Sequence, residues 1–360
     1  MRIRVTEDSD NKCRLTAVDL FCGSGAVTEA LRRQGYRVLV AVDNDPIACR
    51  TYKQNHYRTR VICDDIDKVD PATHSKFVGV GAVDLLIVCA PCQPFSSQNR
   101  AHKDALIADD RARLLLQCVK FARSLKPKVL LFENVSGLAA LHNQVLLQQL
   151  KSELADEGYL LSEPRRVDAA DLGVPQRRVR CVMVAGRSPE AIGHFEKAVL
   201  RPASMTVKEA IGHLPALNSG ERSETDELHF ARTHQDVVLE RLRYISKNGG
   251  SRSDLPKRLE LACHEGRTKS FSDVYGRMRW DDVAPTLTTG CTDVTKGRYA
   301  HPEQDRAITL REAALLQTFP PEYRFHGNTA QIARQIGNAV PVRMLEALMP
   351  VVTTMIRPPA

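Results

Sequence analysis

The sequence of 360 residues lacks an apolar run long enough to cross a bilayer. Its longest apolar stretch, Val78 to Pro91, is interrupted by Asp84, whereas a membrane-spanning helix needs about 20 consecutive apolar residues. The opening MRIRVTEDSD has no apolar core of a secretory signal peptide, and no lipidation motif is present. We therefore expect a soluble protein with no role in a membrane.

The sequence also lacks the regular cysteine spacing of a disulfide framework. Its ten cysteines are scattered through apolar contexts, which favours a reducing, cytoplasmic compartment. Cys89 and Cys92 form the motif CAPC, but no second CxxC completes a zinc site. We expect no bound metal, and we expect Cys89 to be packed in a strand.

Internal repeats and low-complexity segments are absent as well. With 43% hydrophobic and 26% charged residues, the composition is that of a globular protein. At this length we expect one large domain and a smaller one, because single cores stop growing at about 250–300 residues.

In the first half, short β-branched runs alternate with longer amphipathic segments, which is typical of βαβ units around a parallel sheet. The sequence therefore predicts an α/β fold. Strands are expected at 16–20, 38–42, 61–63, 84–89, 129–132 and 179–185. The alternation fades after Arg187, and helical periodicity returns at Leu310. The expected division is a catalytic and cofactor-binding domain at 1–186, a recognition domain at 187–300, and a segment at 301–360 that returns to the first domain.

The net charge is +8, and ten basic and four acidic side chains lie between Arg241 and Arg279. About a tenth of the chain therefore carries most of the excess positive charge. Two interpretations stay open at this point, a surface for a polyanion and a solvated face.

The first predicted strand runs into DLFCGSGAVTEAL, in which Gly23 and Gly25 allow a tight turn before a helix. Asp43 ends the second strand, where an acid can accept hydrogen bonds from a ribose. Thr28 takes the place of the third glycine of a pyrophosphate-binding loop, and Asp19 adds negative charge. This pattern favours the cationic cofactor S-adenosylmethionine over NAD, although a plain turn fits the glycines too.

Asp65 and Ile66 follow the third strand, where they would reach an adenine by hydrogen bond and by packing. The alternative is an acid in a loop and an aliphatic side chain in the core.

Three further motifs bring reactive side chains to the same edge of the sheet. Cys92 follows the fourth strand in VCAPCQPFSSQNR, and Glu133 and Asn134 end the fifth in FENVSGL. In GVPQRRVRC, Arg178 and Arg180 share one face of a starting strand, because alternate residues do. A nucleophile, an acid able to hold a proton and a cation thus come together.

The ordered motifs DLFCGSG, PCQPFS, ENV, QRRVR and RQIGNAVP, with AITLREAALLQTFPPEYRF between the last two, resemble those of the bacterial DNA cytosine-5 methyltransferases. The resemblance covers roughly Val18 to Arg343, and it implies a Rossmann-like class I methyltransferase fold with a smaller target-recognition domain. It leaves Arg187 to Trp280 to the variable target-recognition segment.

The resemblance implies that Cys92 attacks C6 of a flipped cytosine and that C5 receives a methyl group from S-adenosylmethionine. Glu133 would donate a proton toward N3, and Arg180, with Arg178 beside it, would stabilise O2 or hold the loop.

The matched motifs also imply binding residues. For the cofactor these are Asp19, Phe21, Gly23, Gly25, Asp43, Asn44, Asp65, Ile66, Pro91, Asn338 and Ala339. For DNA they are Gln93, Ser96, Ser97, Gln98 and Arg111 around the flipped base, and Arg241, Arg243, Lys247, Arg252 and Arg258 in the recognition segment.

The expected partner is double-stranded DNA, with a cognate restriction endonuclease as a partner that the resemblance allows. We expect a monomer in the bacterial cytoplasm, associated with the nucleoid. A tRNA methyltransferase of the same scaffold, an NAD-dependent dehydrogenase and an inactive DNA-binding relative are the alternatives. The absence of a CFT motif counts against the tRNA methyltransferase, and Thr28 counts against the dehydrogenase. The presence of Cys92, Glu133 and Arg180 counts against the inactive relative.

Overall fold

A computed structural model describes residues 14–91, 113–140, 143–200, 203–261 and 273–357. Within these ranges eight strands form one sheet in the order β3-β2-β1-β4-β5-β8-β6, with β7 also paired to β8. Strands β1 to β5 pair in parallel, whereas β8 is antiparallel to β5, β6 and β7. The strands are β1 Thr16–Leu20, β2 Arg37–Asp43, β3 Arg60–Cys63, β4 Leu85–Val88, β5 Val129–Val135, β6 Leu160–Leu161, β7 Arg165–Asp168 and β8 Val179–Gly186. The predicted α/β fold with a mostly parallel sheet is confirmed.

All six predicted strands form, but β5 is longer than predicted. It continues through Glu133 and Asn134 to Val135 because β8 pairs with it along its whole length, as far as Val135 opposite Arg180. Glu133 therefore lies inside a strand and not in the loop after it. Strands β6 and β7 were not predicted, because one has two residues and the other is the charged sequence RRVD.

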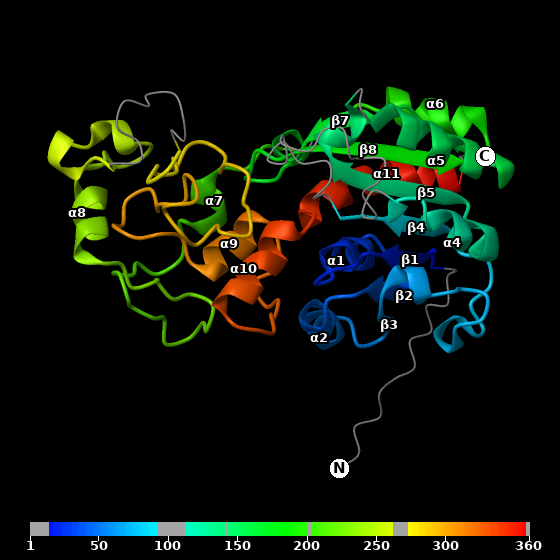
Figure 1. Ribbon diagram of the computed structural model, residues 1–360, viewed down its shortest axis with the longest axis horizontal. Helices are drawn as coiled ribbons and strands as arrows, with labels where there is room; N and C mark the ends of the chain where they lie inside the picture. The colour runs from blue at the N-terminus through cyan, green and yellow to red at the C-terminus, as the bar shows by residue number, and fades with distance from the viewer. Residues whose placement is uncertain (1–13, 92–112, 141–142, 201–202, 262–272, 358–360) are drawn as a thin grey trace, which may run out of the picture.

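Helices cover both faces of the sheet (Figure 1). Alternate residues of β4 separate the two faces: Leu85 and Ile87 belong to a core with α1, α6 and α11, and Leu86 and Val88 to a core with α4 and α5. The helices are α1 Ala26–Arg33, α2 Pro46–Asn55, α4 Cys118–Leu125, α5 Gln144–Asp156, α6 Pro189–Lys197, α7 Val207–Ile211, α8 Asp236–Tyr244, α9 Leu310–Leu316, α10 Thr329–Asn338 and α11 Val342–Ile356.

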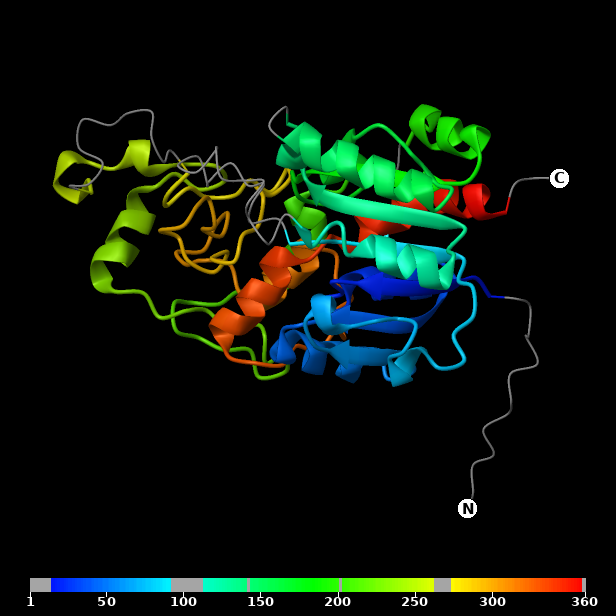
Figure 2. The ribbon, with the colours of Figure 1, turned by 45° about the vertical axis from the view of Figure 1, so that its right-hand side comes forward.

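Sequence reasoning did not single out the helical run Thr329–Ile356, which Arg334, Arg343 and Glu346 interrupt but which is long and apolar enough to cross a membrane by length and mean hydropathy. However, 61% of its most apolar window is buried inside the protein. Its second part, α11, packs on α1 and α6 and carries buried residues such as Leu345 and Leu348. In Figure 2 it is the red helix against the sheet. The run is thus part of the core.

Residues 203–261 and 273–338 lie beside the sheet (Figure 1), and we call them the small lobe. Regular elements are short there, and buried arginines join the loops. Arg277 donates to the backbone carbonyls of Leu242, Ile245, His301 and Gln304.

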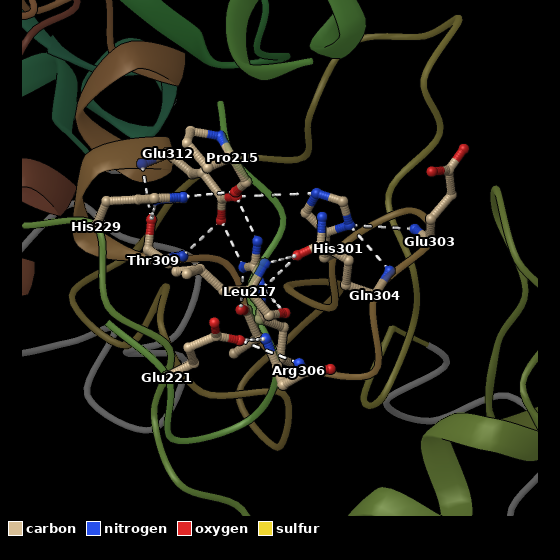
Figure 3. A network of polar contacts seen from close by, with 12 residues as sticks. Pro215, Leu217, Glu221, His229, His301, Glu303, Gln304, Arg306, Thr309 and Glu312 are labelled. Atoms are coloured by element: carbon tan, nitrogen blue, oxygen red, sulfur yellow. Dashed lines mark hydrogen bonds and ion pairs between the residues drawn. The ribbon is translucent and has the colours of Figure 1, made fainter. Parts of the chain in front are cut away.

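Arg306 is fully buried in the small lobe and forms two hydrogen bonds of 2.8 and 2.7 Å with Glu312 (Figure 3). It also donates to the carbonyl of Leu217. Guanidinium groups, each with five donors, thus satisfy carbonyls that no strand pairs.

Candidate active site

The loop between β1 and α1 has an unusual backbone. Phe21, Gly23 and Gly25 have φ of 61°, 52° and 97°. Glycine adopts positive φ without strain, whereas Phe21 does so at a cost. A Cβ at Gly23 would meet nothing within 4 Å, whereas one at Gly25 would lie 2.7 Å from the His56 ring. The sequence GSG therefore leaves open space beside Gly23 and allows close packing behind Gly25.

Asp43 fixes this loop from the end of β2. Its Oδ2 accepts from the Gly23 amide at 2.8 Å, and its Oδ1 accepts from the Asp45 amide at 2.8 Å. Burial raises the pKa of Asp43 above its ordinary value, against the effect of these hydrogen bonds. Each oxygen keeps a second lone pair, so the carboxylate can also accept from a ligand hydroxyl.

Asp19 lies at the adjacent tip of β1 and is fully buried. Its Oδ2 accepts from Thr28 at 2.9 Å, and the Thr28 hydroxyl is 2.6 Å from that of Tyr52. Oδ1 has no hydrogen-bond partner among the described residues. Burial, together with the charge of Asp43, raises the pKa of Asp19 to about 7. A buried carboxylate oxygen with no partner suits a cationic ligand group.

The sheet register aligns the remaining predicted cofactor residues at the same edge. Asp43 pairs with Cys63 at the end of β3, and Leu20 pairs with Val88 at the end of β4. Asp65 caps the short 3-10 turn after β3. The first residue of that turn, Ile66, is buried. Pro91 is half-buried three residues after β4, and Asn44 is exposed after β2.

Glu133 and Arg180 form a buried ion pair between β5 and β8. The distance from Arg180 Nε to Glu133 Oε1 is 2.8 Å, and both side chains are at least nine-tenths buried. The next residue on β5, Asn134, donates through Nδ2 to the carbonyl of Ala90 at 3.1 Å. Strand β5 therefore holds both the acid and the backbone that leads to Cys92.

Arg178 does not join this pair. It precedes β8, and its guanidinium donates to the carbonyl of Leu287 at 2.9 Å and to that of Gly337 at 3.0 Å. Alternation along a strand predicts a shared face for Arg178 and Arg180, but Arg178 lies outside the regular strand. Its contacts connect the sheet to two parts of the small lobe, the loop at Leu287 and helix α10.

Asn338 is exposed at the end of α10, and Ala339 caps that helix. Gly337, just before them, packs so closely that a Cβ there would lie 2.4 Å from the Thr288 backbone. Gln317 donates to the Ile336 carbonyl at 2.7 Å and accepts from the buried Gln176 at 3.0 Å. The motifs around Gln176, Gln317 and Gly337 thus meet in space.

The predicted nucleophile Cys92 lies outside the described residues, as do the predicted DNA contacts Gln93, Ser96, Ser97, Gln98 and Arg111.

The five predicted recognition cations differ in their contacts. Arg241 donates to the Leu259 carbonyl and lies over the Tyr275 ring, so it holds the small lobe together. Lys247 pairs with Asp305, and Arg258 pairs with Glu240. Arg243 is exposed and Arg252 is half-buried.

Sequence reasoning missed His56 and Tyr323, which both contact the β1–α1 loop. His56 Nε2 is 3.1 Å from the Gly25 carbonyl oxygen, and Tyr323 donates to the Ser24 carbonyl at 2.5 Å. A buried histidine carries no periodic signal, and Tyr323 is 299 residues from Ser24. The position of Tyr323 in the late motif AITLREAALLQTFPPEYRF was the available signal.

The site edge as a whole fits S-adenosylmethionine. Asp19 offers an unpartnered oxygen for a cationic group, Asp43 can accept from a ribose, and open space adjoins Gly23. Among the described residues no cluster of three histidine, cysteine or acidic side chains could hold a metal ion.

Comparison with known proteins gives one consistent result. The family of C-5 cytosine-specific DNA methylases matches residues 15–353. The chain is 37% identical to the Type II methylase M.HgiDII of Herpetosiphon aurantiacus, over 91% of this chain and 92% of that protein. It is 31% identical to the Type II methyltransferase M1.HphI of Haemophilus parahaemolyticus, over 95% and 87%.

Among solved structures, a prophage-encoded protein of Escherichia coli matches with a TM-score of 0.72 at 22% identity, covering 95% of this chain and 99% of that one. The Dnmt2 methyltransferase of S. pombe matches with a TM-score of 0.62 at 16% identity, over 94% and 98%. These likenesses confirm the methyltransferase fold.

Proposed function

Because the chain belongs to the C-5 cytosine-specific DNA methylases, which use S-adenosylmethionine as methyl donor, we propose that it methylates a flipped cytosine in a specific duplex sequence through a covalent Cys92 adduct. The family makes it a DNA (cytosine-5-)-methyltransferase of the kind found in Type II restriction–modification systems. The flipped base, the sequence specificity and the adduct are the parts of this function that we propose.

One observation carries the proposal for the chemistry. Strand β5 carries the buried Glu133, paired with Arg180 at 2.8 Å, and its next residue, Asn134, is hydrogen-bonded to Ala90, two residues before Cys92. An acid, a cation and the start of the nucleophile's segment are therefore held by one strand pair. Cytosine is a weak electrophile, so a thiolate that adds to C6 needs these groups beside it.

The proposed steps follow from the residues. The Cys92 thiolate adds to C6, and Glu133, in its protonated form, donates a proton to N3, so that electron density moves toward C5. Arg180 holds the Glu133 carboxyl in place and stabilises charge at O2. S-adenosylmethionine, when bound, supplies the electrophilic methyl group that C5 receives. Loss of the C5 proton to water then forms the C5–C6 double bond again and expels Cys92 as thiolate, and N3 returns its proton to Glu133.

For the cofactor we propose three sets of contacts at the carboxyl edge of the sheet. Asp19 faces a cationic group, Asp43 accepts from the ribose hydroxyls, and Asp65 and Ile66 contact the adenine. Phe21, Gly23, Gly25, Asn44, Pro91, Asn338 and Ala339 complete the proposed pocket.

We propose the same division of the chain as in the sequence analysis. Residues 1–186 bind the cofactor and carry the chemistry, and 187–300 read the DNA, except for α6, which packs on the sheet. Residues 301–360 pass through the small lobe as far as α10 before α11 returns to the first part. Arg178 acts in this scheme as a positioning residue, because it donates to Leu287 and Gly337. Arg243, Arg252 and Arg258 are the proposed DNA contacts of the small lobe, with Lys247 released from Asp305.

The proposed setting is the cytoplasm of a bacterium, where a monomer acts on nucleoid DNA beside a cognate restriction endonuclease. The two similar Type II proteins named above are bacterial.

The decisive experiment is transfer of a labelled methyl group from S-adenosylmethionine to unmethylated duplex DNA, with tRNA as a second acceptor. Wild-type protein labels DNA, and Cys92→Ala abolishes the label while cofactor binding stays within a few fold. The matched control is Cys89→Ala, three residues earlier in the same motif, which retains transfer. Transfer by Cys92→Ala would remove the thiol mechanism, and label on tRNA alone would assign an RNA substrate.

A further inference from the structure

Two carbonyls of the β1–α1 loop are held by side chains from other parts of the chain. The Tyr323 hydroxyl donates to the Ser24 carbonyl at 2.5 Å, and His56 Nε2 lies 3.1 Å from the Gly25 carbonyl oxygen. The same nitrogen is 3.0 Å from the Tyr323 hydroxyl. His56 is 5% exposed and Tyr323 is 2% exposed, so water does not compete for these bonds.

The protonation of this group follows from its burial. Burial lowers the pKa of His56 to about 4, so the imidazole is neutral at pH 7. Because Nε2 faces a carbonyl oxygen, the ring proton lies on Nε2 and is donated to Gly25. The Tyr323 proton is donated to Ser24. The Ser24 carbonyl therefore accepts from Tyr323, and the Gly25 carbonyl accepts from His56 in addition to the Glu29 amide, which donates to it at 2.9 Å.

The loop needs such support because its backbone is strained. Phe21 has a φ of 61°, which a non-glycine residue adopts at a cost, and Gly23 and Gly25 also have positive φ. A Cβ at Gly25 would lie 2.8 Å from both His56 Nε2 and the Tyr323 hydroxyl. Only a glycine at position 25 leaves room for the His56 and Tyr323 side chains. Their contacts in turn restrict the conformations that the loop can adopt.

The supporting residues are themselves fixed to the helix that follows Asp43. His56 caps the end of α2, and Asn55 and Arg324 exchange two hydrogen bonds of 2.7 and 3.1 Å. At the other end of α2, Arg334 on α10 pairs with the capping Asp45 at 2.9 Å. Arg324 and Arg334, both from the C-terminal part of the chain, therefore contact the two ends of α2.

We propose that Tyr323 and His56 are positioning residues for cofactor binding, which hold the Ser24 and Gly25 carbonyls and so keep the loop competent for S-adenosylmethionine. Tyr323 also connects this loop to the segment that precedes α10, whose last residue is Asn338. The proposal rests on the proposed assignment of residues 21–25 to the cofactor.

The first test is calorimetric titration of the full chain with S-adenosylmethionine, without DNA. Tyr323→Phe keeps the ring and removes the donor, so a smaller fraction of the free protein has the competent loop. The apparent Kd rises in inverse proportion to that fraction. We expect a rise of about 5- to 10-fold, the effect of one buried hydrogen bond.

The matched control is Tyr159→Phe. Tyr159 is equally buried and donates to the Pro127 carbonyl at 2.7 Å, just before β5 begins and therefore at the opposite edge of the sheet. This variant loses the same hydroxyl, so its thermal stability falls by a similar amount, but its Kd stays within twofold of wild type.

A second pair of variants tests His56. His56→Gln places an amide donor where Nε2 lies and restores binding to within about threefold of wild type, whereas His56→Phe weakens it as much as Tyr323→Phe. In steady-state transfer to unmethylated DNA by Tyr323→Phe and His56→Phe, we expect KM for the cofactor to rise and kcat to stay within twofold of wild type. Saturating cofactor selects the competent loop.

Two outcomes overturn the proposal: equal cofactor affinity of Tyr323→Phe and wild type, or equal weakening by Tyr159→Phe, which would indicate a loss of stability alone. Wild-type protein that fails to bind S-adenosylmethionine would instead overturn the assignment of the pocket.

Discussion

Glu133 is a carboxylate placed inside the sheet, between two strands of opposite direction. Its neighbour across the strand pair is Val182, and its ion-pair partner Arg180 lies opposite Val135. The side chain therefore has few alternative positions. A group that is fixed in this way can act on a transition state without first being ordered.

Substitution of Glu133 tests its role as proton donor. Glu133→Gln keeps the shape but cannot donate an acidic proton, so we expect kcat to fall by about 10²–10⁴-fold with the cofactor Kd nearly unchanged. The matched control is Glu29→Gln, which changes another buried acid paired with arginines, on α1. Methyl transfer at the wild-type rate by Glu133→Gln would contradict the proposed role.

Substitution of Asp19 is expected to raise the stability of the cofactor-free protein and to weaken cofactor binding. Its pKa of about 7 in the folded protein lies above the ordinary value of 3.8, so the folded state holds a proton that the unfolded state releases between these values. Stability that depends on Asp19 therefore falls as pH rises from 4 to 7.

The variant Asp19→Asn removes this pH dependence. We expect its free energy of unfolding without cofactor to exceed that of wild type at pH 8 by about 2–4 kcal/mol. Its affinity for S-adenosylmethionine falls at least about 10-fold, since a charge-assisted contact is lost. Denaturant unfolding at pH 5 and pH 8, with calorimetry at pH 8, measures both. Unchanged affinity would show that Asp19 does not contact the cofactor's charge.

At the residue scale, the sequence predicted the acids at strand ends, because strand, turn and acid are adjacent in the chain. It placed Asp19, Asp43 and Glu133 at one edge of the sheet, as the structure does. It did not predict His56 or the different contacts of Arg178. The partners of these residues lie far away in the sequence, 267 residues from His56 to Tyr323 and 159 from Arg178 to Gly337.

At the scale of the secondary-structure elements, helix α10 contains a glycine, Gly337, that close packing against the backbone requires. Gly337 lies in the helix, where glycine is unfavourable, and a Cβ there would come within 2.4 Å of the Thr288 backbone. Because the neighbour is backbone, it cannot rotate away. The helix end that carries Asn338 therefore depends on the absence of a side chain one residue earlier.

Gly337→Ala is expected to lower the free energy of unfolding by about 1–3 kcal/mol through overpacking. Gly193→Ala is the control, because Gly193 lies in α6 and its Cβ would meet nothing within 4 Å. That substitution stabilises by about 0.5–1 kcal/mol through helix propensity and loss of chain entropy. Denaturant midpoints of the two variants compare the effects directly, and an equal shift in both would contradict the packing argument.

The sequence predicted elements best where their pattern is local. Periods of apolar residues located the six main strands, but the length of β5 depends on pairing with β8, about 50 residues later in the chain. Before Leu310 the small lobe has little periodicity to detect, since buried arginines that donate to backbone carbonyls replace regular strand pairing there.

On the scale of the whole molecule, the buried pair of Arg306 and Glu312 holds the small lobe together. Burial alone would raise the pKa of Glu312, but the hydrogen bonds and charge of Arg306 outweigh it, and the net pKa is lowered. The stabilisation by this carboxylate is therefore present above its ordinary pKa and is lost as pH falls below that value.

Arg306→Met leaves the carboxylate of Glu312 buried without its cation, and we expect a loss of about 3–5 kcal/mol in stability. Arg258→Met, which breaks the exposed pair with Glu240, leaves the free energy of unfolding nearly unchanged, because water and salt screen that pair. Hydrogen exchange distinguishes local from global effects. In Arg306→Met we expect amide protection to fall first in the small lobe. Equal losses of stability in Arg306→Met and Arg258→Met would contradict the larger role assigned to the buried pair.

The packing of α11 on α1 has a consequence for synthesis of the chain on the ribosome. Helix α1 ends at Arg33 and its partner begins at Val342, so translation proceeds through the whole small lobe before the two can meet. During that time the part of α1 that α11 covers stays exposed, and we expect this apolar surface of the nascent chain to bind chaperones. We therefore expect the cofactor loop joined to α1 to reach its final packing only after α11 has been made.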